Sequence, residues 1–163
     1  MIIDTHANLY YPDILERIDE VIENAINNGI TKIIAPAIDL KTSEIILELS
    51  SKYEIVYAAL GFHPSEILNL TDKDFQTLEE LLKEDKVVAV GETGLYYYWD
   101  ISFKEKQIEF FKRHLELSAK HNLPLIIHTR DSVKDAIKII KQLEQSFGCI
   151  FHLYMCLYLH SFA

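Results

Sequence analysis

Short apolar runs alternate with longer amphipathic segments along most of the chain. The apolar runs predict six strands, at residues 2–3, 32–37, 55–60, 87–90, 123–127 and 149–151. Between these runs, apolar residues recur every three or four positions, which predicts five helices. Strands that are apolar throughout are typical of a parallel sheet covered by helices. The pattern therefore predicts an α/β fold of the (β/α) type.

The predicted helices carry local start and stop signals. Asn28-Gly29 is a stop for the first helix, because both residue types tolerate the left-handed backbone that ends helices. Thr71 is the expected N-cap of the third helix, and Ser102-x-x-Glu105 has the spacing of a capping box for the fourth. Asp131-Ser132 is the expected start of the fifth. These signals divide the chain into strand–helix units.

The composition is that of an ordinary soluble globular protein. Apolar residues make up 49% of the 163 positions and charged residues 25%, which argues against disorder. No apolar run is long enough to span a membrane, and the N-terminus lacks the features of a signal peptide. Cys149 and Cys156 have no metal-knuckle spacing, so reduced thiols are expected. We therefore expect a cytoplasmic protein without a membrane partner.

The formal net charge is −9. Proteins that bind nucleic acids usually present a basic face, so this charge counts against stable duplex binding. It counts less against a nuclease, because bound divalent cations can supply the positive charge at the phosphate.

Side chains that bind metals follow the predicted strands. They stand directly after five of the six strands, at His6, His63, Glu92, His128 and His152. In a parallel barrel all such positions lie on one rim, where active sites are built. Converging imidazole and carboxylate groups bind ions such as Zn²⁺, Mn²⁺ or Mg²⁺. The sequence therefore predicts a divalent-metal site on this rim.

Five short motifs surround these residues in order along the chain. They are Asp4-Thr5-His6-Ala7-Asn8-Leu9, Gly61-Phe62-His63-Pro64, Gly91-Glu92-Thr93-Gly94-Leu95, Leu123 to Arg130, and Phe151-His152. Together they resemble the signatures of TatD-like deoxyribonucleases, which are metal-dependent hydrolases on a TIM-barrel scaffold. Gln107 and His114 also resemble family positions. The resemblance implies a TIM-type (β/α) barrel that is incomplete, with about six of eight βα units.

The resemblance also implies a role for each site residue. The implied metal ligands are His6, Glu92, His128 and His152. Glu92 would bridge two divalent ions (Mg, Mn or Zn), and Glu92 and His128 would be the catalytic residues. His63 and Arg130 would contact the substrate phosphate. The implied reaction is hydrolysis of DNA phosphodiester bonds by metal-activated water, with no nucleophile from the protein.

Three features depart from the family pattern. Residue 8 is Asn where the pattern has a second His, and Tyr96 stands where the Glu motif usually continues with Asp. The third is length, because a full barrel of this type has eight strands and roughly 250 residues. We assign residues 1–152 to a partial barrel hydrolase domain and residues 153–163 to an atypical tail, interpreted as out of frame. We expect one metal site to be degraded and catalysis to be impaired.

Two other functions stay open beside the deoxyribonuclease. The first is an inactive remnant, or a protein retained for binding a partner. The second is an amidohydrolase-type enzyme, since that group also opens with a His motif after the first strand. Glu92, in place of a lysine after the fourth strand, favours the nuclease branch. An incomplete barrel would leave strand edges unpaired, so self-association that covers them is expected.

Overall fold

The computed structural model describes residues 1–98, 101–147 and 154–155. The strands are β1 (Ile2–Asp4), β2 (Ile30–Pro36), β3 (Val56–Leu60), β4 (Val87–Tyr96), β5 (Leu125–Arg130) and β6 (Tyr154–Met155). The helices are α1 (Pro12–Leu15), α2 (Ile18–Asn27), α3 (Leu40–Lys52), the short 3-10 helix η1 (Ile67–Asn69), α4 (Asp72–Leu81), α5 (Lys104–His121) and α6 (Val133–Phe147). Strands and helices thus alternate, as the apolar pattern predicts.

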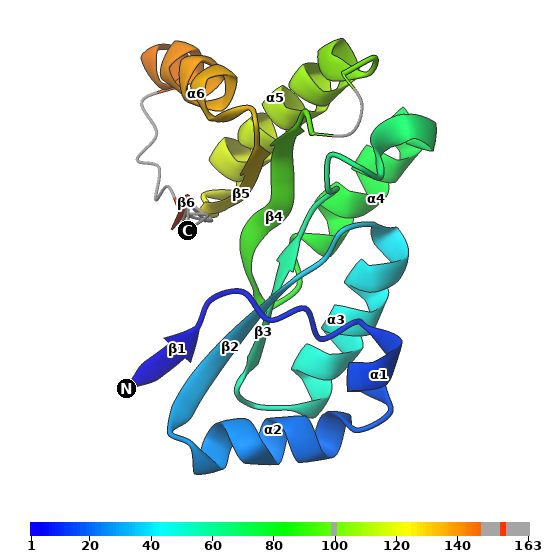
Figure 1. Cartoon of the computed structure of the whole chain (residues 1–163), viewed down its shortest axis with the longest axis vertical. Coiled ribbons are helices and arrows are strands. Elements are labelled where there is room, and N and C mark those ends of the chain that lie inside the picture. Colours follow the sequence, from blue (N-terminus) through cyan, green and yellow to red (C-terminus); the bar gives the residue numbers. More distant parts are fainter. Residues whose placement is uncertain (99–100, 148–153, 156–163) are drawn as a thin grey trace, which may run out of the picture.

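The six strands form one parallel sheet in the order β1-β2-β3-β4-β5-β6. A helix lies in each connection between neighbouring strands. Figure 1 shows the sheet curling from β1 and β2 in the lower half of the view to β5 in the upper half, with β6 beside it at the left. This is the arrangement of a TIM-type (β/α) barrel, here with six strands. The predicted fold class is confirmed.

The core lies between the strands and the helices that cover them. α3 packs on β3 and α5 packs on β4. Val56 and Leu60 of β3, Ile46 of α3 and Phe111 of α5 are fully buried. This buried layer holds the helices against the strands whose residues form the site. None of the helices in the described part of the chain is long and apolar enough to cross a membrane.

The structure corrects the predicted strand ends. β4 continues through the Glu92 motif, and β5 continues to Arg130, because residues 93–96 pair in parallel with residues 127–130. Glu92 and His128 therefore lie within β4 and β5, and Arg130 is the last residue of β5, so none of the three follows its strand as predicted. The sixth strand predicted at residues 149–151 falls outside the described residues.

The structure also tests the predicted helix ends. The first predicted helix divides into α1 and α2 at Arg17, whose backbone (φ −134°, ψ 33°) is not helical. The predicted capping box at Ser102 is wrong, because the N-cap of α5 is Phe103, whose side chain makes no capping hydrogen bond. The predicted start at Thr71 is confirmed. Its N–H and hydroxyl donate to the Asp74 carboxylate at 2.7 Å and 2.6 Å.

β1 is an edge strand with exposed apolar side chains. Ile2 and Ile3 are 55% and 39% exposed. An apolar edge is a template for pairing with another chain, and proteins commonly block such edges with lysine.

We propose that the chain self-associates through β1. Light scattering is expected to give a mass above that of one chain, and Ile2→Lys to lower it. A wild type that stays monomeric as its concentration rises would contradict the proposal.

Candidate metal centre

The segment after β2 accepts backbone hydrogen bonds from two candidate site residues, Glu92 and His63. The Ala37 carbonyl accepts a hydrogen bond from the Glu92 N–H at 3.0 Å. The Ile38 carbonyl accepts one from the His63 N–H at 2.9 Å. His63 follows β3 and Glu92 lies in β4, so residues from two neighbouring strands meet at adjacent carbonyls. The backbone of the rim thereby fixes the spacing of both side chains.

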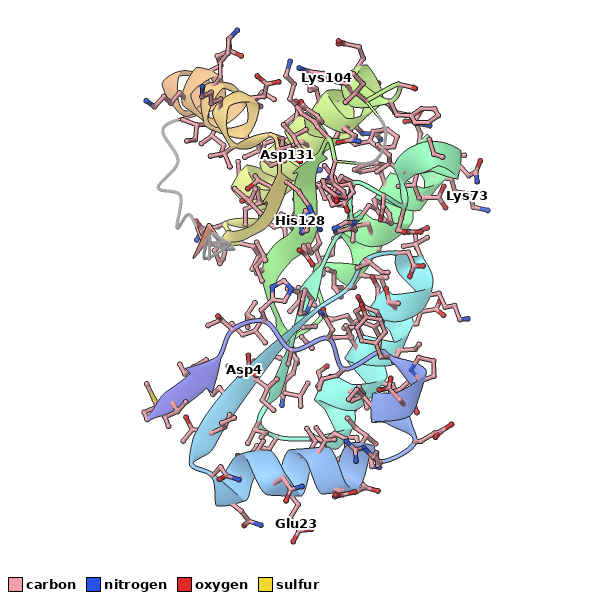
Figure 2. All side chains as sticks on the ribbon, viewed as in Figure 1. Asp4, Glu23, Lys73, Lys104, His128 and Asp131 are labelled. Carbon is pink, nitrogen blue, oxygen red and sulfur yellow. The ribbon has the colours of Figure 1, made fainter. Side chains whose placement is uncertain are left out.

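The Glu92 carboxylate lies between two histidines. His6 Nε2 is 3.3 Å from Oε2, and His128 Nδ1 is 2.8 Å from Oε1. Figure 2 shows His128 on β5, near the middle of the molecule. Glu92 is only 8% exposed, so this carboxylate is largely removed from water. One imidazole at each oxygen is compatible with the bridging role that the resemblance implies for Glu92.

His63 joins the same cluster. Ligand atoms of His63, Glu92 and His128 lie within 4.8 Å of one another, close enough to hold a single cation. The ring centroids of His63 and His128 are 4.4 Å apart. The sequence predicts a phosphate contact for His63, whereas the geometry also makes it a candidate ligand. Both roles stay predictions.

The electrostatics of the cluster favour an ionised carboxylate. Burial raises the pKa of Glu92, but the hydrogen bonds from His128 and His6 outweigh burial and hold that pKa well below its usual range. The hydrogen bond to Glu92 raises the pKa of His6 despite its partial burial. Burial, and then the nearby His128, lower the pKa of His63 to about 4. An ionised Glu92 and a neutral His63 are the protonation states that bind metals.

Two buried acceptor atoms have no hydrogen-bond partner among the described residues. They are Nε2 of His128 and Oδ1 of Asn8. An ionised Glu92 can only accept, so the Nδ1–H of His128 donates to it, and in a neutral ring Nε2 then carries the lone pair. A buried lone pair without a donor is costly unless a ligand satisfies it. The donor set and the orphaned Nε2 of His128 therefore fit a divalent cation.

Arg130 lies beside the cluster. Its guanidinium carbon is 3.9 Å from the Tyr98 ring centroid and 5.8 Å from that of Tyr96. The Tyr96 ring is in turn 5.4 Å from the His128 ring. Arg130 is exposed, and stacking on an aromatic face limits the orientations of its side chain. Arg130, for which the resemblance implies a contact with the substrate phosphate, thus lies next to the candidate ligands.

The structure does not place every predicted site residue. It brings together His6, Glu92 and His128, with His63 and Arg130 beside them. His152 lies outside the described residues, so its metal-binding role stays a prediction. Two buried polar residues of α5, Gln107 and His114, received no role from the sequence. The available signal was a polar side chain on the apolar face of a helix.

The curled parallel β/α sheet with its His/Glu cluster is part of a (β/α) barrel that carries a candidate metal site. The chain belongs to the TatD related DNase family, whose family model matches residues 3–157. The family resemblance found in the sequence is therefore confirmed.

Relatives and a solved structure agree with this assignment. The uncharacterized metal-dependent hydrolase YabD of Bacillus subtilis is 37% identical over 155 residues, covering 94% of this chain and 61% of YabD. The uncharacterized metal-dependent hydrolase YjjV of Escherichia coli is 34% identical over 130 residues, covering 78% and 50%. The crystal structure of YjjV, a TatD homologue, superposes with a TM-score of 0.82 at 31% identity, covering 86% and 55%. This chain thus spans about half to three-fifths of these relatives.

Acid is expected to destabilise the metal-free chain through its buried histidines. Burial lowers the pKa of His114 to about 4, as it does for His63. Between pH 6.5 and about 4 both histidines are protonated in the unfolded chain but neutral in the folded chain. The free energy of unfolding therefore falls as the pH is lowered through this range. Each group contributes a slope of up to ~1.4 kcal/mol per pH unit in this window. His6, whose pKa is raised, opposes the trend.

The measurement is the urea midpoint of wild type and His114→Gln across this pH range. The variant lacks one of the two acid-sensitive groups, so its midpoint is expected to fall less steeply. Parallel pH profiles would show that His114 does not carry the effect.

Proposed function

We propose that His63, Glu92 and His128 bind a divalent metal ion, with His6 beside them, and that this centre serves to hydrolyse phosphodiester bonds of DNA. The observation that carries the proposal is the buried Glu92 carboxylate, which has an imidazole at each oxygen and a third imidazole within reach. The family model names DNases, whereas the curated relatives are named only as metal-dependent hydrolases. The activity and its substrate are therefore proposals for this chain.

Each residue has a separate task in this proposal. A bound divalent ion supplies Lewis acidity and a lower pKa for water. Glu92 supplies the negative charge that offsets the cation, and its hydrogen bond keeps the Nε2 lone pair of His128 free to bind. Arg130 presents a guanidinium group that can bind a phosphate with two parallel hydrogen bonds. Tyr98 holds that group at the edge of the cluster.

The overall charge supports a role for metal in substrate binding. A chain with net charge −9 repels a polyanion, and the described site offers the Arg130 guanidinium, stacked on Tyr98, as a positive group. A divalent ion beside Glu92 would reverse the local sign and give a phosphate a second positive contact. The proposal therefore requires binding of DNA to depend on the metal as well as on Arg130.

The first test is a metal titration of the purified chain by calorimetry and thermal melting. One tight site for Mn²⁺ is expected, with a midpoint that rises with metal concentration, because a ligand that binds only the folded state stabilises it. Mg²⁺ and Zn²⁺ are compared in the same way. A melting transition indifferent to all three ions would refute the metal site.

The second test is cleavage of end-labelled DNA with Mn²⁺, using single-stranded and duplex substrates and EDTA as the control. The expected result is metal-dependent cleavage that Arg130→Ala weakens mainly through KM, because Arg130 contacts the phosphate. Metal binding without cleavage of DNA would leave the site intact and refute the substrate. Hydrolysis of amide or lactone substrates under those conditions would favour the amidohydrolase class instead.

A further inference from the structure

Helix α5 carries three buried polar side chains on one face, and two of them, Gln107 and His114, bind backbone near the metal cluster. Gln107 is 5% exposed and His114 is completely buried. They are seven residues apart, which is two helical turns, so both point toward the same side of α5. Buried polar groups are retained only with hydrogen-bond partners, and the partners of these two are informative. Both partners are backbone groups of segments at the metal-site rim.

The side-chain amide of Gln107 makes two hydrogen bonds to the backbone of Tyr96. Its Oε1 accepts from the Tyr96 N–H at 2.7 Å, and its Nε2 donates to the Tyr96 carbonyl at 3.0 Å. This amide behaves as one further peptide unit beside the end of β4. Tyr96 pairs with Arg130 across the sheet, and its ring lies 5.4 Å from the His128 ring. The contact therefore anchors the β4 and β5 side of the cluster.

His114 binds the backbone on the other side of the cluster. Its Nε2 accepts from the Phe62 N–H at 3.0 Å, and its Nδ1 donates to the Phe110 carbonyl at 2.7 Å. Because Phe62 N–H can only donate, Nε2 must be the unprotonated nitrogen. Phe62 directly precedes His63. The His114 ring thus links α5 to the segment that presents a candidate ligand.

We propose that Gln107 and His114 are positioning residues that set the geometry of the metal centre from α5. His114 fixes the backbone next to His63. Gln107 fixes the backbone of Tyr96, which lies beside Arg130 and His128. The inference rests on the proposed metal site for its role in binding. It goes beyond that site because neither residue is itself a ligand.

The alternative is that both hydrogen bonds serve stability alone, and the same helix offers a control for it. Ser118 follows His114 by four residues, is 4% exposed, and donates to the Leu123 carbonyl at 2.6 Å. Leu123 precedes β5, at the end of the sheet opposite the metal cluster. Ser118→Ala therefore removes a buried hydrogen bond from the same face of α5 without touching the rim.

The test makes the same three measurements on four purified variants, of which Ser118→Ala is the control. Gln107→Met and His114→Met keep side-chain volume but remove the hydrogen bonds to the rim. His114→Gln keeps an acceptor where Nε2 stood, so it can still satisfy the Phe62 N–H. Each variant is assayed for Mn²⁺ affinity by calorimetry, for melting midpoint without metal, and for the ring resonances of His63 and His128 by NMR.

Both Met variants are expected to weaken Mn²⁺ binding about 10-fold or more, as loss of outer-shell partners does. Their His63 and His128 resonances are expected to move in the metal-free chain. His114→Gln is expected to restore most of the affinity, and Ser118→Ala to lower the midpoint while affinity and resonances stay unchanged. Should the Met variants fail to fold, His114→Gln and Gln107→Glu, which also keeps an acceptor, are compared by the same resonances.

Two failures can be told apart. If the wild type binds no metal, the proposed function fails, and the metal-free resonances still decide whether α5 positions the rim histidines. If the wild type binds metal and the Met variants match Ser118→Ala in every readout, the positioning role is overturned and the two contacts are structural only.

Discussion

Replacing Glu92 with Gln is expected to abolish the stabilisation of the chain by metal. The change keeps the shape of the side chain but removes the negative charge, and an amide offers a cation only one neutral oxygen. It also leaves the Nδ1–H of His128 without its ionised acceptor, so the tautomer of that ring is no longer fixed. Two of the three clustered ligands are thus impaired by one substitution.

The expected size of this effect follows from mass action. At a metal concentration 100 times the dissociation constant, the wild type gains about 2.7 kcal/mol, and the variant is expected to gain almost none. The measurement is the melting midpoint with and without Mn²⁺. Glu79→Gln is the matched control, because Glu79 also contacts a histidine, His121 Nε2 at 3.3 Å, on helices away from the cluster. A Glu92→Gln chain that responds to metal as Glu79→Gln does would exclude Glu92 as a ligand.

Replacing Gly94 with Ala is expected to be the most destabilising single-methyl change in the described rim. Gly94 has φ +142°, which residues with a Cβ rarely adopt, and an added Cβ would lie 2.0 Å from the His128 carbonyl oxygen. That oxygen belongs to the paired strand, since Gly94 and His128 are partners in the β4–β5 ladder. The clash can be relieved only if β4 and β5 move apart at His128, which is a candidate metal ligand.

Overpacking typically costs 1–3 kcal/mol, and unfavourable backbone adds roughly 1–2 kcal/mol, so a loss of about 3 kcal/mol or more is expected. The measurement is the urea midpoint, together with Mn²⁺ affinity. Gly29→Ala separates the two costs, because Gly29 has φ +85° but no atom within 4 Å of an added Cβ. It should lose only the backbone contribution and keep its metal affinity. Equal losses in both variants would show that the contact with His128 is not the cause.

The sequence predicts the strand–helix order because that order depends on local patterns. Apolar residues spaced for one strand or one helix face need no knowledge of distant partners. The end of β4 was misplaced because it depends on residues 127–130, which lie more than thirty positions away in the sequence. The Ser102 signal failed in a similar way, since α5 begins after Phe103 whatever the local spacing suggests.

The site shows the same division. The rule that parallel strands end on one rim predicts that His6, Glu92 and His128 meet, because it depends only on fold class. The same rule puts His63 on that rim, but its approach to within ligand distance of Glu92 depends on how two adjacent carbonyls after β2 hold both backbones. Nor does the rule predict protonation states, since these follow from burial and from the hydrogen bonds within the cluster.

The sequence by itself determined the family, the fold class and the residue types of a candidate metal centre, because motifs and apolar periodicity are properties of short segments. Only the tertiary structure showed that Gln107 and His114 reach the backbone of the rim. Their partners are 11 and 52 residues away, and nothing in the local sequence specifies which distant N–H a buried side chain will meet. That choice is made by packing α5 on β4, which brings one helix face against both sides of the cluster.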